Sequence, residues 1–511
     1  MAFTILLIAL FPVLYYLLPY LADDKKLRRF PSPFPAAFSE FWLFYQARRG
    51  RRYLAVHAAH EKYGRFVRVQ PKHVSVADSA AIPAIYGHGT GFTKSEYYDS
   101  FVSIARGLFN TRDRAEHTRK RKTVSHIFST KSVLQFEPFI HHNLELLAKQ
   151  WNKMSDRPDL PGGFHKLDCL HYFNYLAFDI ISDLTFGAPF GMLESCKDEA
   201  AVKDPRTGKV TTAPAIEVLN RRGEVSGTLG CVPWVKKYAK YIPDKFFTQG
   251  IKAVENLAGI AIARVSERLD HGKGAGREDL LKKLMDGRDG DGNPLGRKET
   301  EAEALTMLIA GSDTTSNTLC SLMFWVLRTP GVLQTLQKEL DAALSPHGEW
   351  EIPRYGAVKD LPYLRAVINE TLRIHSTSSL GLPRLVPPEG ATVCGEFFTG
   401  GTVLSVPAYT IHHSTEVWGE NAEEFVPERW FDLTALQKRS FIPFSTGPRA
   451  CVGQNLAEIE MTTIVATVFS GWEWKFAEGE LQGLPGAELN TCEGFLRKPL
   501  GVEVGVKRRR A

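Results

Sequence analysis

The stretch FSTGPRACVGQ, residues 444–454, sets one of only seven cysteines between two glycines. A helical pattern of apolar residues follows it, so Cys451 should lie just before a helix N-terminus, where backbone N–H groups and the helix dipole favour a thiolate. Gly447 and Gly453 permit tight turns and close approach of a flat group, and Arg449 can reach an anion. The stretch predicts a loop that presents a thiolate to a large planar anion; the alternative is a buried structural cysteine.

A second unusual segment lies within a long apolar helix that the sequence predicts from about Thr300 to Pro330. Thr300 and Glu303 have the spacing of a capping box at its start. The middle of the helix, AGSDTTSNT (310–318), gathers a glycine and short polar residues that are poor helix formers. Taken alone, this cluster predicts equally well a binding site or a kink in which hydroxyls bond back to carbonyls.

Charged residues recur in two further motifs. INETLRIH (368–375) places Glu370 and Arg373 on one face of a helix, and FVPERW adds Arg429. If they are buried together, a glutamate between two arginines would fix two chain segments relative to each other. If they form exposed pairs, they would contribute little to stability.

The composition is that of a globular protein: 511 residues, 44% hydrophobic and 23% charged, with a formal charge of +6. No basic run is interleaved with aromatic residues, so nucleic acid is not an expected partner. The seven cysteines form no C-x-x-C pair, which argues against zinc and a disulfide framework and fits a reducing compartment. No G-x-G-x-x-G fingerprint occurs, so nicotinamide chemistry must come from a partner.

The N-terminus predicts a membrane anchor. Residues 2–21 contain no charged side chain and are long enough for one helix to span a bilayer. A cleaved signal peptide, the alternative, needs a basic start and a small-residue cleavage site that are missing. Basic residues follow directly, which places the rest of the chain in the cytosol. We therefore expect an anchor at 1–22, a basic, proline-rich linker at 23–36 and a catalytic domain at 37–511.

Together these motifs resemble the cytochrome P450 family. F-x-x-G-x-R-x-C-x-G (444–453) is similar to its haem-binding signature, and residues 310–315 to its oxygen-activation helix. Glu370-x-x-Arg373 and Arg429 are similar to its E-x-x-R and P-E-R-F elements, although Trp430 replaces the phenylalanine. The resemblance implies a mainly α fold with small β-sheets: a triangular helical haem domain after one N-terminal transmembrane helix.

The resemblance also implies a cofactor, haem b (iron protoporphyrin IX), with a cysteine thiolate as axial ligand. His117 and Arg121 stand where the family often has W-x-x-x-R, and Arg384 resembles a further propionate contact. The residues that the resemblance places around the haem are Cys451 as iron ligand, Phe444, Arg449, Gly453, His117, Arg121, Arg384, and Gly311, which would leave room for oxygen.

For catalysis, the resemblance assigns Thr314 to hydrogen-bond the bound dioxygen and Asp313 to deliver protons. Electrons would come from NADPH through a separate NADPH–cytochrome P450 reductase in the same membrane, with or without cytochrome b5. The implied location is the endoplasmic reticulum membrane, with a single span and a cytosolic catalytic domain.

Further stretches narrow the resemblance to the fungal benzoate 4-monooxygenases. This implies hydroxylation of benzoate at the para position, giving 4-hydroxybenzoate. The alternatives are another aromatic acid or a phenylpropanoid as substrate, and a non-catalytic haem-binding or sensing protein. A sensor has no need of the proton relay that Asp313 and Thr314 would form. The stretches that carry this resemblance are residues 110–126, 173–181, 184–193, 217–226 and 493–501.

Benzoate is an anion, and burying its carboxylate is unfavourable without hydrogen-bond donors at the far end of the pocket. The hydroxyls of Ser376, Thr377, Ser378 and Ser379 are the preferred donors. Arg221 and Arg222 are the alternative, placed second because a double arginine in a helix is usually a solvated face. The segments that the resemblance places at the substrate are Thr93–Tyr98, Arg221–Ser226, Ser376–Gly381 and Glu493–Phe495.

Overall fold

The computed structural model describes residues 14–271, 279–344, 350–479 and 488–509. Most of the predicted anchor (1–22) therefore lies outside the described residues, although residues 14–22 are helical. Within the four described ranges, no helix combines the length and hydrophobicity that a membrane span needs. The predicted linker is not a free spacer. Leu27 and Phe30 are buried, and the Phe30 ring stacks on Phe398 with centroids 5.4 Å apart.

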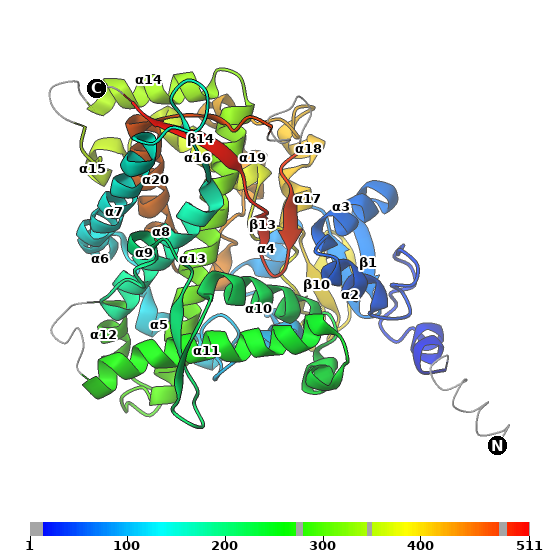
Figure 1. Ribbon diagram of the computed structural model, residues 1–511. Coiled ribbons are helices and arrows are strands. Elements are labelled where there is room, and N and C mark those ends of the chain that lie inside the picture. Colours follow the sequence, from blue (N-terminus) through cyan, green and yellow to red (C-terminus); the bar gives the residue numbers. More distant parts are fainter. Residues whose placement is uncertain (1–13, 272–278, 345–349, 480–487, 510–511) are drawn as a thin grey trace.

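Helix α13 (Arg297–Arg328) runs through the middle of the helical part of the chain (Figure 1). It packs along α8 (Cys169–Phe186) and also contacts α11 (Lys245–His271), α16 (Pro362–Ile374) and α20 (Gln454–Gly471). It begins three residues before the predicted start, so the predicted capping box is wrong. The Thr300 hydroxyl instead bonds back to the Gly296 carbonyl, and the Glu303 carboxylate accepts a hydrogen bond from the Leu108 N–H at 3.0 Å.

Helices dominate the described chain, which confirms the prediction of a mainly α fold with small sheets. The remaining α-helices are α2 (Phe41–Arg48), α3 (Arg52–Tyr63), α4 (Ala81–Tyr86), α5 (Arg114–Ser125), α6 (Thr130–Val133), α7 (Glu137–Ser155), α9 (Met192–Ser195), α10 (Ala215–Leu229), α11 (Lys245–His271), α12 (Leu280–Met285), α14 (Val332–Leu344), α15 (Tyr355–Val358), α16 (Pro362–Ile374), α17 (Ala408–His412), α18 (Thr415–Trp418), α19 (Ala435–Ser440) and α20 (Gln454–Gly471). The 3-10 helices are η1 (Glu96–Phe101), η2 (Leu134–Phe136), η3 (Pro233–Tyr241), η4 (Pro427–Phe431) and η5 (Gly447–Arg449).

The largest sheet has five strands in the order β1-β2-β10-β7-β3. Its β2–β10 pair is parallel, with Val74 opposite Leu404, so the sheet joins the start of the chain to its last third. A second sheet has the order β11-β14-β4, and three hairpins (β5–β6, β8–β9 and β12–β13) complete the strands. The strands are β1 (Phe66–Gln70), β2 (His73–Val76), β3 (Thr93–Lys94), β4 (His165–Asp168), β5 (Ala200–Lys203), β6 (Val210–Ala213), β7 (Arg384–Leu385), β8 (Ala391–Val393), β9 (Glu396–Phe398), β10 (Val403–Ser405), β11 (Trp472–Phe476), β12 (Thr491–Glu493), β13 (Arg497–Pro499) and β14 (Glu503–Arg508).

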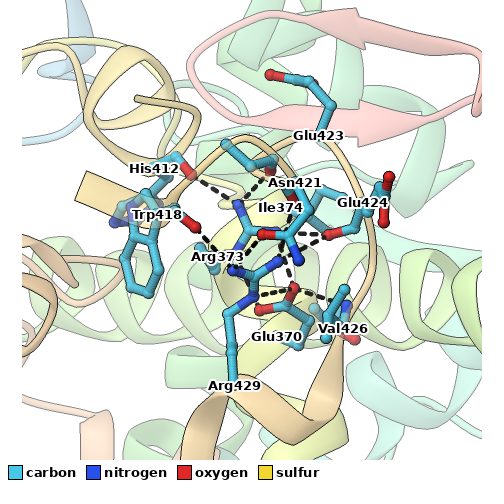
Figure 2. Close-up of polar contacts among 12 residues, drawn as sticks. Glu370, Arg373, Ile374, His412, Trp418, Asn421, Glu423, Glu424, Val426 and Arg429 are labelled. Carbon is cyan, nitrogen blue, oxygen red and sulfur yellow. Dashed lines mark hydrogen bonds and ion pairs between the residues drawn. The ribbon is translucent and has the colours of Figure 1, made fainter. Parts of the chain in front are cut away.

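The Glu370 motif is buried and joins distant segments, as Figure 2 shows. The Glu370 carboxylate accepts hydrogen bonds from Arg373 at 2.8 and 2.9 Å and from Arg429 at 3.0 Å. Arg373 also donates to the carbonyls of His412 and Ala422, each at 2.7 Å. Of the two readings of this motif, the structure therefore has the buried one, in which a glutamate between two arginines connects α16 to the segment 412–430.

Trp430, which departs from the resemblance, takes part in the same network. Its indole N–H donates to the second carboxylate oxygen of Glu370 at 2.9 Å, a bond that phenylalanine cannot make. Burial raises the pKa of Glu370, but the hydrogen bonds and charges of Arg373 and Arg429 outweigh this effect, so the net pKa lies below its usual value. The carboxylate is thus held ionised between its partners.

Replacing Glu370 by glutamine should destabilise the protein strongly, because two buried guanidinium groups then face a neutral amide. We expect a loss of about 3–5 kcal/mol in the free energy of unfolding, measured by denaturant titration. Asp341→Asn is the matched control, because Asp341 pairs with Arg509 on the surface and should cost less than about 1 kcal/mol. Equal losses in the two variants would contradict the role given to Glu370.

Candidate active site

The cysteine loop lies where the sequence predicts it. Cys451 follows η5 and precedes α20, whose N-cap is Gly453. The Cys451 N–H donates to the Phe444 carbonyl at 2.9 Å, and the Arg121 guanidinium donates to the Ala450 carbonyl. These two hydrogen bonds hold the peptide group between Ala450 and Cys451 through its carbonyl and its N–H.

Gly447 is the residue that allows this loop to pack. Its φ is +71°, which non-glycine residues rarely adopt. A Cβ atom there would also lie 1.9 Å from the backbone oxygen of Tyr86, at the end of α4. Position 447 therefore requires glycine for two independent reasons, one conformational and one steric.

The thiol faces a cavity of about 330 Å³ between the cysteine loop, α13, α10 and the β12–β13 hairpin. Burial raises the pKa of the Cys451 thiol, while the Gly453 N–H and the Arg121 charge lower it; the net pKa lies above its usual value. The helix terminus acts in the predicted direction through the Gly453 N–H, but desolvation outweighs it. A metal ion that binds the sulfur would remove the proton outright.

Several cations approach the cavity without acidic partners. Lys94, Arg384 and Arg449 line it, and none forms an ion pair with a carboxylate within the described ranges. Their hydrogen bonds go to neutral groups: Lys94 to the Phe109 carbonyl, Arg384 to the Tyr98 hydroxyl at 2.8 Å, and Arg449 to the Thr111 carbonyl at 2.7 Å. Such a cluster is unfavourable unless an anion joins it.

His117 and Arg121 are on α5 and are not among the residues that line the cavity. Burial lowers the pKa of His117 to about 3, and the charges of Arg449, Lys94 and Arg121 add to the effect. His117 is therefore neutral at ordinary pH. The thiol that faces the cavity and the surplus of positive charge on the same cavity fit haem, since its iron takes a thiolate and its two propionates are anions.

The comparison with protein families decides the assignment. A model described as cytochrome P450 matches residues 31–505. The chain belongs to the cytochrome P450 family. Members of this family are monooxygenases with a haem-thiolate cofactor, and they generally need a reductase partner.

Individual relatives are similar over nearly the whole chain. Two Aspergillus niger proteins named benzoate 4-monooxygenase bphA are each 58% identical over 504 residues, covering 97% of this chain and 96% of their own length. Cytochrome P450 monooxygenases of Aspergillus flavus and Aspergillus terreus are 27% identical over 503 residues and 29% identical over 478 residues. They match 95% and 90% of this chain, and 93% of their own length in each case.

In this P450, the polar centre of α13 fits both readings of its sequence. The Thr314 hydroxyl donates to the Ala310 carbonyl at 2.7 Å, as in the back-bonded alternative, yet Thr314 also lines the cavity. Asp313 accepts a hydrogen bond from the Asn317 amide at 3.0 Å. Burial raises the pKa of Asp313, with the Lys498 charge acting against it.

Gly311 has a packing role that sequence reasoning missed. A Cβ atom at this position would lie 2.5 Å from the Ile181 side chain, so glycine is what lets α13 approach α8. Its backbone borders the cavity as well. A role in leaving room for oxygen stays a prediction.

Glu460 is a second residue that sequence reasoning missed. It lies on α20, is buried, and accepts a hydrogen bond from the Thr315 hydroxyl at 3.2 Å, while its other carboxylate oxygen has no partner. Burial raises the pKa of Glu460 to about 8. An acid inside the apolar run AEIEMTTIV was the available signal.

The four predicted substrate segments all reach the cavity, but not through every residue named. Thr377 and Ser378 line it, whereas Ser376 and Ser379 do not, and the Ser379 hydroxyl is used on the Ser376 carbonyl. Arg221 lies outside the cavity and pairs with Glu224 at 2.8 Å. The lining residues from these segments are Lys94, Tyr98, Arg222, Thr377, Ser378, Leu380 and Phe495.

Replacing Gly447 by alanine should abolish haem incorporation, because the added methyl group displaces the cysteine loop from α4. Haem content, measured from the Soret band per protein, should fall to near zero. Gly208→Ala is the control, since Gly208 has a similar φ of +70° and no atom within 4 Å of an added Cβ. It should lose about 1–2 kcal/mol of stability and keep its haem; equal behaviour of the two variants would contradict the steric argument.

Glu460 should make the stability of the protein pH-dependent. Because its folded pKa is raised, the folded protein holds a proton that the unfolded chain releases above about pH 4. Stability is therefore lost as pH rises toward about 8. Glu460→Gln should flatten the dependence of Tm on pH between pH 5 and pH 9, while Glu458→Gln, exposed on the same helix, should not. Parallel profiles for all three proteins would refute this.

Proposed function

We propose that this P450 hydroxylates benzoate at the para position to give 4-hydroxybenzoate, using O2 and two electrons from NADPH. Its 58% identity to proteins named benzoate 4-monooxygenase, over 97% of the chain, supports this substrate class. The observation that carries the proposal is a cage of three phenylalanine rings, Phe101, Phe109 and Phe495, in the wall of the cavity.

The three rings meet edge to face. The centroids of Phe101 and Phe495 are 5.0 Å apart, those of Phe109 and Phe495 5.1 Å, and those of Phe101 and Phe109 5.8 Å. A flat aromatic substrate gains most from such surfaces, because aromatic pairs prefer edge-to-face and offset contacts. The cage comes from η1, the loop after it and the β12–β13 turn, so three separate segments of the chain form it.

The haem, when bound, supplies the activation of O2. In the proposed arrangement Cys451 holds the iron, and Lys94, Arg384 and Arg449 hold the propionates with help from α5. The Thr314 hydroxyl keeps a proton at the cavity wall. Asp313 can both hold and release a proton, because burial favours its neutral form while Lys498 and Asn317 favour its ionised form.

Electrons would be delivered by a membrane-bound NADPH–cytochrome P450 reductase, with or without cytochrome b5. The proposed location is the endoplasmic reticulum membrane, with the catalytic domain in the cytosol. The uncharged run at 2–21 and the basic residues that follow it support this location.

Two measurements on the haem-loaded protein test the proposal. Titration with benzoate should shift the Soret band from low to high spin, and reconstitution with a P450 reductase and NADPH should convert benzoate to 4-hydroxybenzoate, identified by chromatography. A protein that binds and hydroxylates cinnamate but not benzoate would move the substrate to the phenylpropanoids. A haem-loaded protein that turns over neither would point to a binding or sensing role.

A further inference from the structure

Arg222 is a buried cation that faces the cavity without an acidic partner. It lies on α10, is 6% exposed and lines the cavity wall. Its guanidinium donates one hydrogen bond, to the Phe101 carbonyl at 3.0 Å. Its Nε atom is buried and has no partner, and no ion pair with a carboxylate is formed within the described part of the chain.

Three other buried arginines of this chain are paired with carboxylates, whereas Arg68, Arg384 and Arg497 form no ion pair within the described residues. Arg373 pairs with Glu370 at 2.8 Å, Arg52 with Glu493 at 3.3 Å and Arg268 with Asp279 at 3.1 Å. Burial lowers the pKa of Arg222 to about 10, so it keeps its charge at neutral pH. A buried charge with a single hydrogen bond is unfavourable unless a ligand completes it.

We propose that Arg222 is the anchor for the carboxylate of the aromatic substrate. The inference rests on the proposed function and adds the residue that sets its preference for acids. A guanidinium offers a planar fork of donors that matches a carboxylate. Phe101 links the two halves of the site, since its carbonyl and ring contact Arg222 and its ring belongs to the phenylalanine cage.

The other donors near the cavity fit the substrate carboxylate less well. Lys94 lies with Arg384 and Arg449, where the haem propionates would bind, and burial together with the charges of these two arginines lowers its pKa. The Ser379 hydroxyl is already used on a backbone carbonyl, and the Thr377 and Ser378 hydroxyls, which line the cavity, bring no charge to a carboxylate. Arg221, next in sequence, pairs with Glu224 and packs on Phe246 outside the cavity.

A second cation reinforces the field at Arg222. Lys236 donates to the carbonyls of Asp99 and Val102 at 3.0 and 2.8 Å, which places it beside the same loop. Burial lowers the pKa of Lys236 to about 8, and the charge of Arg222 contributes. Asp99, the acid of this region, is shared by Arg106 and Arg112. The potential at this end of the cavity therefore favours an anion.

The test compares benzoate with benzamide, its neutral analogue, by Soret titration of the full-length haem-loaded protein. Arg222→Gln should weaken benzoate at least about 30-fold while changing benzamide less than about threefold. Arg222→Lys keeps the charge but loses the planar fork of donors. Its dissociation constant for benzoate should lie between those of the wild type and Arg222→Gln. Arg221→Gln is the matched control and should leave both dissociation constants unchanged. Haem content reports whether each variant folds. If Arg222→Gln fails to incorporate haem, the same titrations are made with Arg222→Lys.

Four outcomes decide the inference. Equal weakening of benzoate and benzamide in Arg222→Gln would mean that Arg222 only positions Phe101, and would overturn it. An unchanged benzoate affinity would overturn it and leave the proposed function standing. The wild-type protein could instead bind another aromatic carboxylate and not benzoate. If Arg222→Gln then weakens that carboxylate but not its amide, benzoate is refuted as the substrate and the role of Arg222 as the carboxylate anchor is supported. A wild-type protein with no preference for any aromatic carboxylate over its amide would overturn both.

Discussion

The position of the cysteine loop depends on the buried carboxylate of Glu370. Arg373, held by that carboxylate, donates to the His412 carbonyl at 2.7 Å. The imidazole of His412 accepts the Ile442 N–H at 3.0 Å, at the start of the segment that leads into the cysteine loop. The Phe444 carbonyl then accepts the N–H of Cys451. A chain of short hydrogen bonds thus runs from α16 to the thiol, and every acceptor in it is buried or half-buried.

The cavity carries positive charge in two places, and neither is balanced by the described chain. One is the cluster of Lys94, Arg384 and Arg449; the other is Arg222. Unpaired buried charges lower stability, so a fold that keeps them must recover the free energy when ligands bind. Two anionic groups at different parts of one cavity meet this requirement. The propionates of the haem suit the cluster near the cysteine loop, and a substrate carboxylate suits the arginine on α10.

The sequence predicted the parts of the site that local spacing determines. The cysteine loop, the polar centre of α13 and the Glu370 motif each lie within a few residues, so their geometry follows from a turn or a helical period. The capping box was predicted wrongly because Glu303 is used by a distant loop. Lys94 and Glu460 were missed because their burial depends on which segments pack over them.

Arg222 shows where a local signal existed and was ranked second, because the hydroxyls of Ser376–Ser379 were preferred to the arginine pair. Buried residues on α10 recur at Val218, Leu219, Val225 and Leu229, and Arg222 takes the intervening position of the same stripe. Arg221 is turned about 100° away from it on the helix, toward solvent. An arginine in the middle of an apolar stripe, such as Arg222, indicates a ligand. When Arg221 and Arg222 are considered together, the pair instead suggests a solvated helix face.

The thiol and the cations pose opposite electrostatic problems that one cofactor can solve. Without a metal, desolvation keeps the Cys451 sulfur protonated, which protects it from reaction because only the thiolate is nucleophilic. Without anions, Arg384 and Arg449 repel each other, and this repulsion contributes to the lowered pKa of Arg449, after burial. Haem brings a metal to the first site and two carboxylates to the second. The Cys451 sulfur lacks a metal and the cations lack anions until the haem binds. This explains why the sequence signature joins Cys451 to Arg449, two residues before it.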